Sequence, residues 1–323
     1  DQGYDDLLNR VMAPYDETTN PSGGAEWKYI GANVHKPGAP ESQLLDPTYV
    51  KDFGDVQVGF IGAVTEHLDE LVSPAGIEGV EIEDIVTATN READALTAAG
   101  VEIVVLLVHE GAATTGIESA TDPESDFGAI VNGVDGDVDA IVSGHTHLAY
   151  NHAVPVQEWI DEGRDVTARP VVSAGQYGSN LNQLLFSVDS GSGELVDLEQ
   201  KVLALKTGQT ANYPVDEATK KIVDAAVAEA DVLGAEPLGE IAGPFSRAKL
   251  ANGTTENRGG ESTAGNLVAE VQRWATESET TGSAQIAFMN PGGLRADMVG
   301  SGTDYPRTLT YKQAAEVQPF ANT

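Results

Sequence analysis

Residues 141–147 read Ile-Val-Ser-Gly-His-Thr-His and join an apolar run to two histidines that are one residue apart. The apolar residues predict a strand that ends near Val142. In an extended segment, residues i and i+2 face the same way, so His145 and His147 could both reach into one small cavity. Because neutral imidazole is the commonest side-chain metal ligand, this loop could clamp one metal ion or serve two adjacent ions.

A second stretch has the same form. Residues 101–108 are largely apolar but too short to cross a membrane, and they predict a strand buried on both faces of a helix-covered sheet. The strand stops at His109, and open α/β sheets build their sites where buried strands end. A single histidine in either place would more often be a structural residue than a ligand, but the two strand ends together favour a metal site. We expect the other histidines to lie on the surface or in loops; these are His35, His67 and His152.

Along the rest of the chain, predicted strands first alternate with predicted helices, and a polar segment then interrupts this pattern. This alternation, followed by a hairpin, predicts an α/β sandwich with mixed sheets. The polar residues 207–214 mark a boundary, so we expect three parts: residues 1–206, a linker and helix at 207–235, and a second domain at 236–323. The predicted helices are 4–13, 80–99, 127–131, 216–233 and 261–274, and the further predicted strands are 26–34, 56–64, 170–174, 183–188, 194–205 and 284–289.

The composition excludes several classes of function. With 51 acidic and 18 basic residues, the formal net charge is −33. Nonspecific binding to nucleic acid relies on Lys and Arg, so we expect no nucleic-acid polymer as a partner, and no docking on anionic lipid. A phosphate-ester substrate would need local cations that reverse this field. The chain has no cysteine, which excludes disulfides, thiolate zinc sites and cysteine nucleophiles.

The second domain carries a glycine turn that suits an anion. The predicted strand 284–289 ends at Asn290, and Pro291-Gly292-Gly293-Leu294-Arg295 follows. Glycines after a strand let backbone approach a ligand closely, and an arginine can hold an anion in a bidentate contact. By itself the pattern is weak, because most such segments are only turns.

Taken together and in this order, five segments resemble those of the calcineurin-like metallophosphoesterases, and specifically the 5'-nucleotidase group. The resemblance implies a four-layer α/β/β/α metallophosphoesterase sandwich followed by a smaller α+β domain that selects the substrate. It covers nearly the whole chain. The segments are residues 106–111 (LLVHEG), 143–147 (SGHTH), 262–267 (STAGNL), 290–295 (NPGGLR) and 318–323 (QPFANT).

The resemblance also implies roles for individual residues. His109 and His145 would bind one of two divalent ions, Zn, Mn or similar, and His147 would bind the other. In the second domain, the substrate-binding residues would be Arg258 and Arg295 on the phosphate, Asn290 in hydrogen bonding, Gly292 and Gly293 in the turn, and Phe320 against the base.

The sequence departs from the family pattern at both ends. We find no Asp-x-His pair, no bridging Asp and no Asn-His-Glu motif before His109, and residues 1–4 look like the tail of that last motif. A second stacking aromatic beyond Phe320 is also missing. We therefore expect a piece of a longer protein, truncated at both ends, with little or no activity of its own and at most weak binding of one metal. No catalytic acid or base is assigned.

For the parent protein, the resemblance implies hydrolysis of nucleoside monophosphates to nucleoside and phosphate. We expect a small-molecule nucleotide as the partner, no membrane insertion, and an exported prokaryotic protein that is extracellular, periplasmic or on the cell surface. Relatives with this architecture leave other substrates open: 2',3'-cyclic nucleotides, UDP-sugars or a thiosulfate ester. A non-catalytic nucleotide-binding or surface protein that retains the fold is the alternative from another class.

Overall fold

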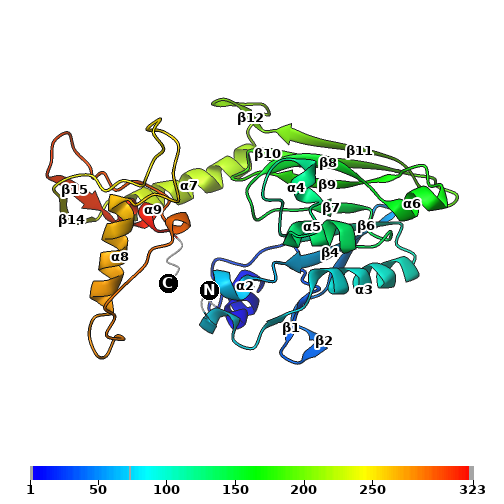
Figure 1. Cartoon of the computed structure of the whole chain (residues 1–323), viewed down its shortest axis with the longest axis horizontal. Coiled ribbons are helices and arrows are strands. Elements are labelled where there is room, and N and C mark those ends of the chain that lie inside the picture. Colours follow the sequence, from blue (N-terminus) through cyan, green and yellow to red (C-terminus); the bar gives the residue numbers. More distant parts are fainter. Residues whose placement is uncertain (1–2, 73, 320–323) are drawn as a thin grey trace. The chain divides into compact units, whose positions relative to one another are not determined.

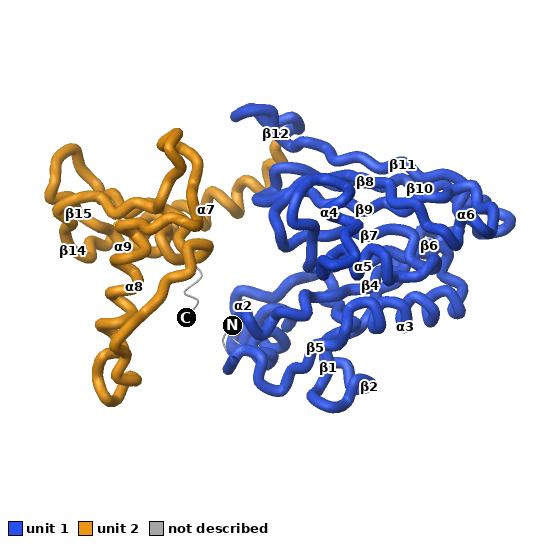
Figure 2. Tube along the Cα trace, viewed as in Figure 1, with its two compact units in different colours: residues 1–214 blue, residues 215–323 orange. Residues whose placement is uncertain are grey.

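The structure, a computed structural model, describes residues 3–72 and 74–319. The chain forms two compact units, Asp1–Pro214 and Val215–Thr323 (Figure 2). Each unit has its own buried apolar cluster. Within the described residues, no helix is long and apolar enough to cross a bilayer.

Unit 1 is built on a six-stranded mixed sheet with the strand order β3-β4-β6-β7-β9-β8. The four inner strands run parallel, and the two edge strands run antiparallel to their neighbours. The apolar run before His109 forms the inner strand β6, as predicted, and most of its side chains are buried. The strands are β3 (Thr48–Asp52), β4 (Gln57–Val64), β6 (Ile103–His109), β7 (Ala140–Val142), β8 (Ala149–Pro155) and β9 (Ala168–Ala174).

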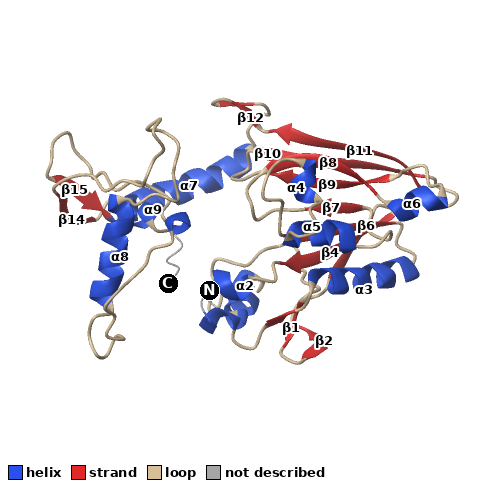
Figure 3. Cartoon of the chain, in the orientation of Figure 1, coloured by secondary structure: helices blue, strands red, loops and turns tan. Residues whose placement is uncertain are grey.

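Two layers cover this sheet. On one face, α3 (Ile85–Ala98) and α5 (Asp126–Gly133) pack their apolar residues against the strands (Figures 1 and 3). On the other face, the hairpin of β10 (Asn180–Val188) and β11 (Leu195–Ala204) packs on β6 and β7 through Leu184 and other apolar side chains. The mixed α/β class that the sequence predicts is confirmed, with helices, a large sheet and a second sheet in successive layers. The smaller elements of this part are α2 (Leu68–Leu71), η2 (Pro74–Ile77), α4 (Ile117–Ala120), α6 (Gln157–Glu162), β12 (Lys206–Thr207) and β13 (Thr210–Ala211).

The first residues of unit 1 differ from the sequence prediction. The predicted strand 26–34 is wrong: Trp27 is 72% exposed, and Ile30 forms an isolated bridge with Asp46. The segment crosses beside β4, where Gly62 makes room because a methyl group there would lie 2.4 Å from Ile30 O. The elements here are α1 (Tyr4–Asp6), the π-helix η1 (Leu7–Val11), β1 (Val34–Lys36), β2 (Ala39–Gln43) and β5 (Glu81–Ile82), and the last three form a small antiparallel sheet.

Two of the histidines assigned to surface or loops lie elsewhere. His35 is 2% exposed in β1, where its Nδ1 lies 3.0 Å from Lys36 O. His152 lies in β8 and its ring stacks on Tyr150, with centroids 5.3 Å apart. The prediction was wrong for both because each sits in a strand that the sequence pattern did not reveal. His67 is half exposed, as expected.

Unit 2 combines helices with a two-stranded sheet around a small core. The predicted helices are confirmed as α7 (Glu217–Gly234) and α8 (Thr263–Ala275). The predicted strand 284–289 is wrong: the segment pairs with no strand in the described part of the chain, and Phe288 is 89% exposed. The remaining elements are β14 (Pro237–Ile241), η3 (Pro291–Gly293), β15 (Arg307–Thr310) and α9 (Tyr311–Val317).

Candidate functional site

The two histidine loops of unit 1 meet at one edge of the sheet. β6 and β7 are parallel neighbours, with Leu107 paired to Val142, so the loops that follow them leave the sheet side by side. His109, the last residue of β6, and His145, in the loop after β7, have ring centroids 5.1 Å apart and planes at 69°. This is the juxtaposition that the two strand ends predict.

The His147 ring lies beside that of Tyr177, with the two ring centroids 6.3 Å apart. Both His145 and His147 have a backbone φ of 62°, in the left-handed region. Across residues 3–72 and 74–319, no group of three or more His, Asp or Glu side chains is arranged to hold a metal ion. His109 and His145 are the two imidazole rings that lie side by side. Their assignment as ligands, and that of His147, stays a prediction.

The environment of His109 favours the form that binds metals. Partial burial lowers the pKa of His109, and the nearby His145 lowers it further. A histidine with a lowered pKa is neutral at physiological pH and presents a free nitrogen lone pair to a cation.

The sequence did not single out the residues that hold these loops. Tyr150, on the unrecognised strand β8, places its hydroxyl 2.7 Å from Ser143 Oγ and accepts a hydrogen bond from Ala112 N. Tyr150 and His152 are two positions apart, so they lie on the same face of β8. This spacing is typical of a strand and could have identified Tyr150 from the sequence.

The glycine turn of unit 2 brings together most of the predicted substrate residues. Asn290 caps the short helix η3, because its Oδ1 accepts a hydrogen bond of 3.0 Å from Gly292 N. Arg295 Nη1 donates to Gly292 O at 3.3 Å. A methyl group added at Gly292 would lie 3.7 Å from Arg258 Nη1, so the second guanidinium also reaches this glycine.

The sequence itself builds this turn. At Gly293 a methyl group would lie 2.8 Å from Met289 Cε, so a larger residue there would have to displace the end of the methionine side chain. Arg295 is anchored through its backbone N–H, which donates to Val317 O at 2.8 Å. The Arg258 side chain is 59% exposed and lies 3.3 Å from a Glu256 carboxylate oxygen. Phe320 lies outside the described residues.

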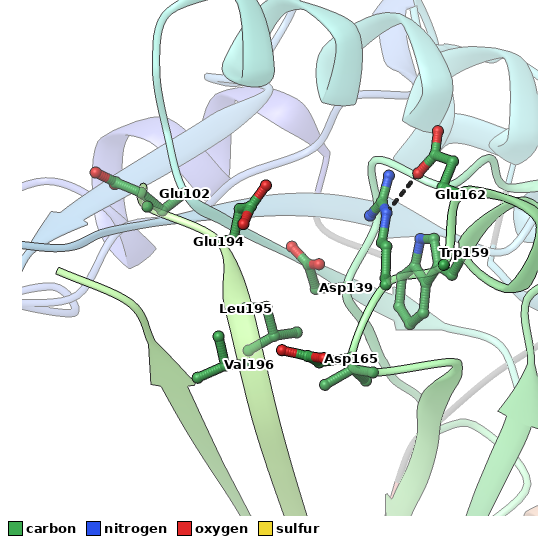
Figure 4. Close-up of a pocket in the computed structure, with 12 residues that line it drawn as sticks. Glu102, Asp139, Trp159, Glu162, Asp165, Glu194, Leu195 and Val196 are labelled. Carbon is green, nitrogen blue, oxygen red and sulfur yellow. Dashed lines mark hydrogen bonds and ion pairs between the residues drawn. The ribbon is translucent and has the colours of Figure 1, made fainter. Parts of the chain in front are cut away.

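A separate pocket of about 540 Å³ contains none of the predicted site residues (Figure 4). Its wall includes Glu102 and Asp139, which precede β6 and β7, so it lies at the end of these strands opposite to His109. Glu162, Asp165 and Glu194 add further carboxylates. This acidic lining is unsuited to a phosphate.

Comparisons with known proteins find a matching family for the second unit and several relatives of the chain. Residues 237–323 match the family described as 5'-nucleotidase, C-terminal domain. The chain is 26% identical to "Endonuclease YhcR" of Bacillus subtilis over all of its own length and 23% of that protein. It is 23% identical to "Cell wall protein Lmo0130" of Listeria monocytogenes over 92% of its length and 37% of that protein. The chain thus spans less than half of the length of these two curated relatives.

Among solved structures, the chain resembles the 5'-nucleotidase precursor from Thermus thermophilus. The two share a TM-score of 0.63 and 24% sequence identity, over 93% of this chain and 54% of the other. This likeness covers both units, although the identity is low. Residues 237–323 therefore match the 5'-nucleotidase C-terminal domain, and the chain as a whole shares the fold of this 5'-nucleotidase precursor.

Proposed function

We propose that the protein hydrolyses phosphate esters of nucleotides, with nucleoside monophosphates as substrates and divalent metal ions as cofactors. The observation that carries this proposal is the convergence of Arg258 and Arg295 on Gly292 in a chain of net charge −33. Two guanidinium groups at one turn place positive charge beside it, and that charge attracts an anion. A phosphate has the oxygen geometry that guanidinium forks match.

Each unit supplies one part of the chemistry. In unit 2, Arg258, Arg295 and the turn would hold the phosphate and Asn290 would hydrogen-bond the substrate. In unit 1, His109 and His145 would hold a divalent ion and His147 would bind a second one. Such ions, when bound, lower the pKa of water and polarise a phosphoryl group. Ligands of nitrogen and oxygen type suit Zn²⁺ or Mn²⁺.

Binding of AMP to this chain, measured by calorimetry with adenosine as the neutral comparison, tests the phosphate site. We expect AMP to bind and adenosine to bind more weakly. Arg295→Gln should weaken AMP binding by about 10- to 150-fold, the loss of a charged hydrogen bond. Arg273→Gln is the matched control, because Arg273 lies on α8 and is paired with Glu270 and Glu277. If Arg258→Gln and Arg295→Gln both leave AMP affinity unchanged, this turn does not bind the phosphate.

A panel of substrates separates the alternatives. With Mn²⁺ or Zn²⁺ present, we would follow phosphate release from AMP, ring opening of 2',3'-cyclic AMP to a nucleoside monophosphate, and formation of UMP from a UDP-sugar. Strand cleavage of plasmid DNA would also be followed, because the Bacillus relative is named an endonuclease. For the whole protein we expect release from AMP and no DNA cleavage. Residues 1–323 alone should release little phosphate, since His109 and His145 supply two ligands where metal sites usually need more. AMP binding without turnover by the whole protein would favour a non-catalytic nucleotide-binding protein.

We also propose an exported protein, at the cell surface or outside the cell. The support is that the Listeria relative is named a cell wall protein. An acidic, cysteine-free chain suits that setting, because it stays soluble and needs no oxidative folding. Fractionation of the source cells tests this, and recovery of the protein in the cytoplasm would contradict it.

A further inference from the structure

A series of hydrogen bonds connects the two histidine loops of unit 1. Ala112 N–H donates to Tyr150 Oη at 3.2 Å, Tyr150 Oη and Ser143 Oγ lie 2.7 Å apart, and Ser143 Oγ donates to Val172 O at 3.0 Å. Either hydroxyl can donate in the bond between Tyr150 and Ser143.

The loops also touch through their backbones. Gly144 N donates to Glu110 O at 3.0 Å. Gly111 has no space for a side chain, because a methyl group there would lie 2.3 Å from Gly144 O. The loop after β6 and the loop after β7 are thus packed backbone to backbone, one residue away from His109 on one side and from His145 on the other.

Between these contacts the backbone is strained. His145 and His147 both adopt a φ of 62°, a conformation that costs a non-glycine residue free energy and persists where the surroundings enforce it. The Tyr150 ring is itself fixed. It stacks on His152 at an interplanar angle of 10° and lies 6.2 Å from the Phe127 ring. A rigid aromatic on β8 therefore sets the position of a hydroxyl that both loops need.

We infer that Tyr150 is a positioning residue that locks the two strand-end loops together and so holds His109 and His145 at the separation observed. The part of this inference that concerns metal rests on the proposed function; the part that concerns the geometry of the loops does not. Tyr150 would not touch the metal or the substrate. Its hydroxyl acts through Ala112 and Ser143, on the loops that carry the histidines.

Tyr150→Phe tests the inference, because it removes only the hydroxyl and keeps the ring stack. Ala112 is 1% exposed, so the loss would leave its N–H buried without a partner. Tyr305→Phe is the matched control: its hydroxyl donates to Val299 O at 3.0 Å in the other unit. Ser143→Ala breaks the same series of hydrogen bonds at its other end. It serves as the second variant if Tyr150→Phe does not fold.

The first readout is the NMR spectrum of the full chain with isotope-labelled histidine, which has six such residues. We expect Tyr150→Phe to shift or broaden the signals of His109, His145 and His147 while those of His35 and His67 stay in place. Tyr305→Phe should change none of them. Unchanged signals from His109 and His145 in Tyr150→Phe would overturn the inference, whatever happens to overall stability.

The second readout is the affinity for Zn²⁺ alone, measured by calorimetry on the same variants. We expect Tyr150→Phe to weaken Zn²⁺ binding by about three- to tenfold, the loss of one hydrogen bond. The double variant Tyr150→Phe/Ser143→Ala should weaken it by less than the product of the two single effects, because both break one chain. If the chain without substitutions binds no Zn²⁺, the proposed role of His109 and His145 as metal ligands in this chain fails. The histidine spectra still decide whether Tyr150 positions the loops.

Discussion

At the scale of single residues, the left-handed backbone of His145 lowers the stability of the fold. A side chain in that conformation costs about 1–2 kcal/mol, whereas glycine adopts it freely. His145→Gly and His145→Ala both remove the imidazole, but only the glycine variant relieves the φ of 62°. We expect His145→Gly to be more stable than His145→Ala by about 1 kcal/mol in urea unfolding.

His67 supplies the control for this comparison. Its φ is −88°, where glycine has no advantage. We expect His67→Gly to be no more stable than His67→Ala. An alanine variant at residue 145 that equals or exceeds the glycine variant in stability would contradict the strained conformation.

Asp139 makes the stability of unit 1 depend on pH. Burial raises the pKa of its carboxyl from 3.8 to about 7, although its Oδ2 accepts a hydrogen bond from Val104 N. Because the folded state holds the proton more tightly than the unfolded state, this group weakens the fold as pH rises from about 4 to about 7. Asp139→Asn removes that loss. The free energy of unfolding of this variant, relative to that of the unsubstituted chain, should therefore increase across this window by up to roughly 4 kcal/mol.

Thermal unfolding of both proteins at pH 4, 6 and 8 measures this difference. The Coulomb attraction of Arg164 and Arg169 opposes the effect of burial, and it is already contained in the raised pKa. A difference between Asn variant and parent that does not change with pH would show that Asp139 stays ionised in the folded chain.

At the scale of secondary-structure elements, Arg169 ties β9 to the connection between α5 and β7. It is 2% exposed, and its guanidinium donates to three carbonyl oxygens, those of Val134, Asp135 and Val138. Arg169→Met would remove the donor from all three carbonyls, of which only that of Asp135 keeps a backbone bond, from Val138 N at 3.4 Å. We expect a loss of about 2–4 kcal/mol in urea unfolding.

Arg164→Met is the control for Arg169→Met. Both guanidinium carbons lie 5.5 Å from the Trp159 ring centroid, but Arg164 is partly exposed and pairs with Glu162. Its loss should cost less than about 1 kcal/mol. Equal losses in the two variants would mean that the contact with the tryptophan ring, not the capping of the carbonyls, is what matters.

The secondary-structure elements also show which features of the fold could be predicted from the sequence. β4, β6 and α8 were predictable because an apolar run or a helical period is a local signal. The approach of His109 to His145 followed from the rule that parallel strands end at one edge. The bond from Ala112 to Tyr150 joins residues 38 positions apart, and no local pattern encodes it. Residues 284–289 have the composition of a strand, but a strand also needs a neighbour to pair with.

At the scale of the whole molecule, the two units differ in how much apolar surface they bury. The core of unit 1 draws on its large sheet and on α3 and α5. In the described part of unit 2, the buried cluster consists of Ala264, Val268, Leu294 and Val317, and α7 leaves Ile222 72% exposed. Since burial of apolar surface is the main favourable term in folding, unit 2 should be the less stable of the two.

Calorimetry on the whole chain should therefore show two transitions, with unit 2 unfolding at the lower temperature. A shorter chain of residues 1–214 should keep only the upper transition, at nearly the same midpoint, because that unit has its own core. Replacing Val268 by alanine should lower the first midpoint and leave the second unchanged, since the cavity it opens lies in unit 2. A single transition in the whole chain that moves as one with Val268→Ala would mean that the two cores fold as one cooperative body.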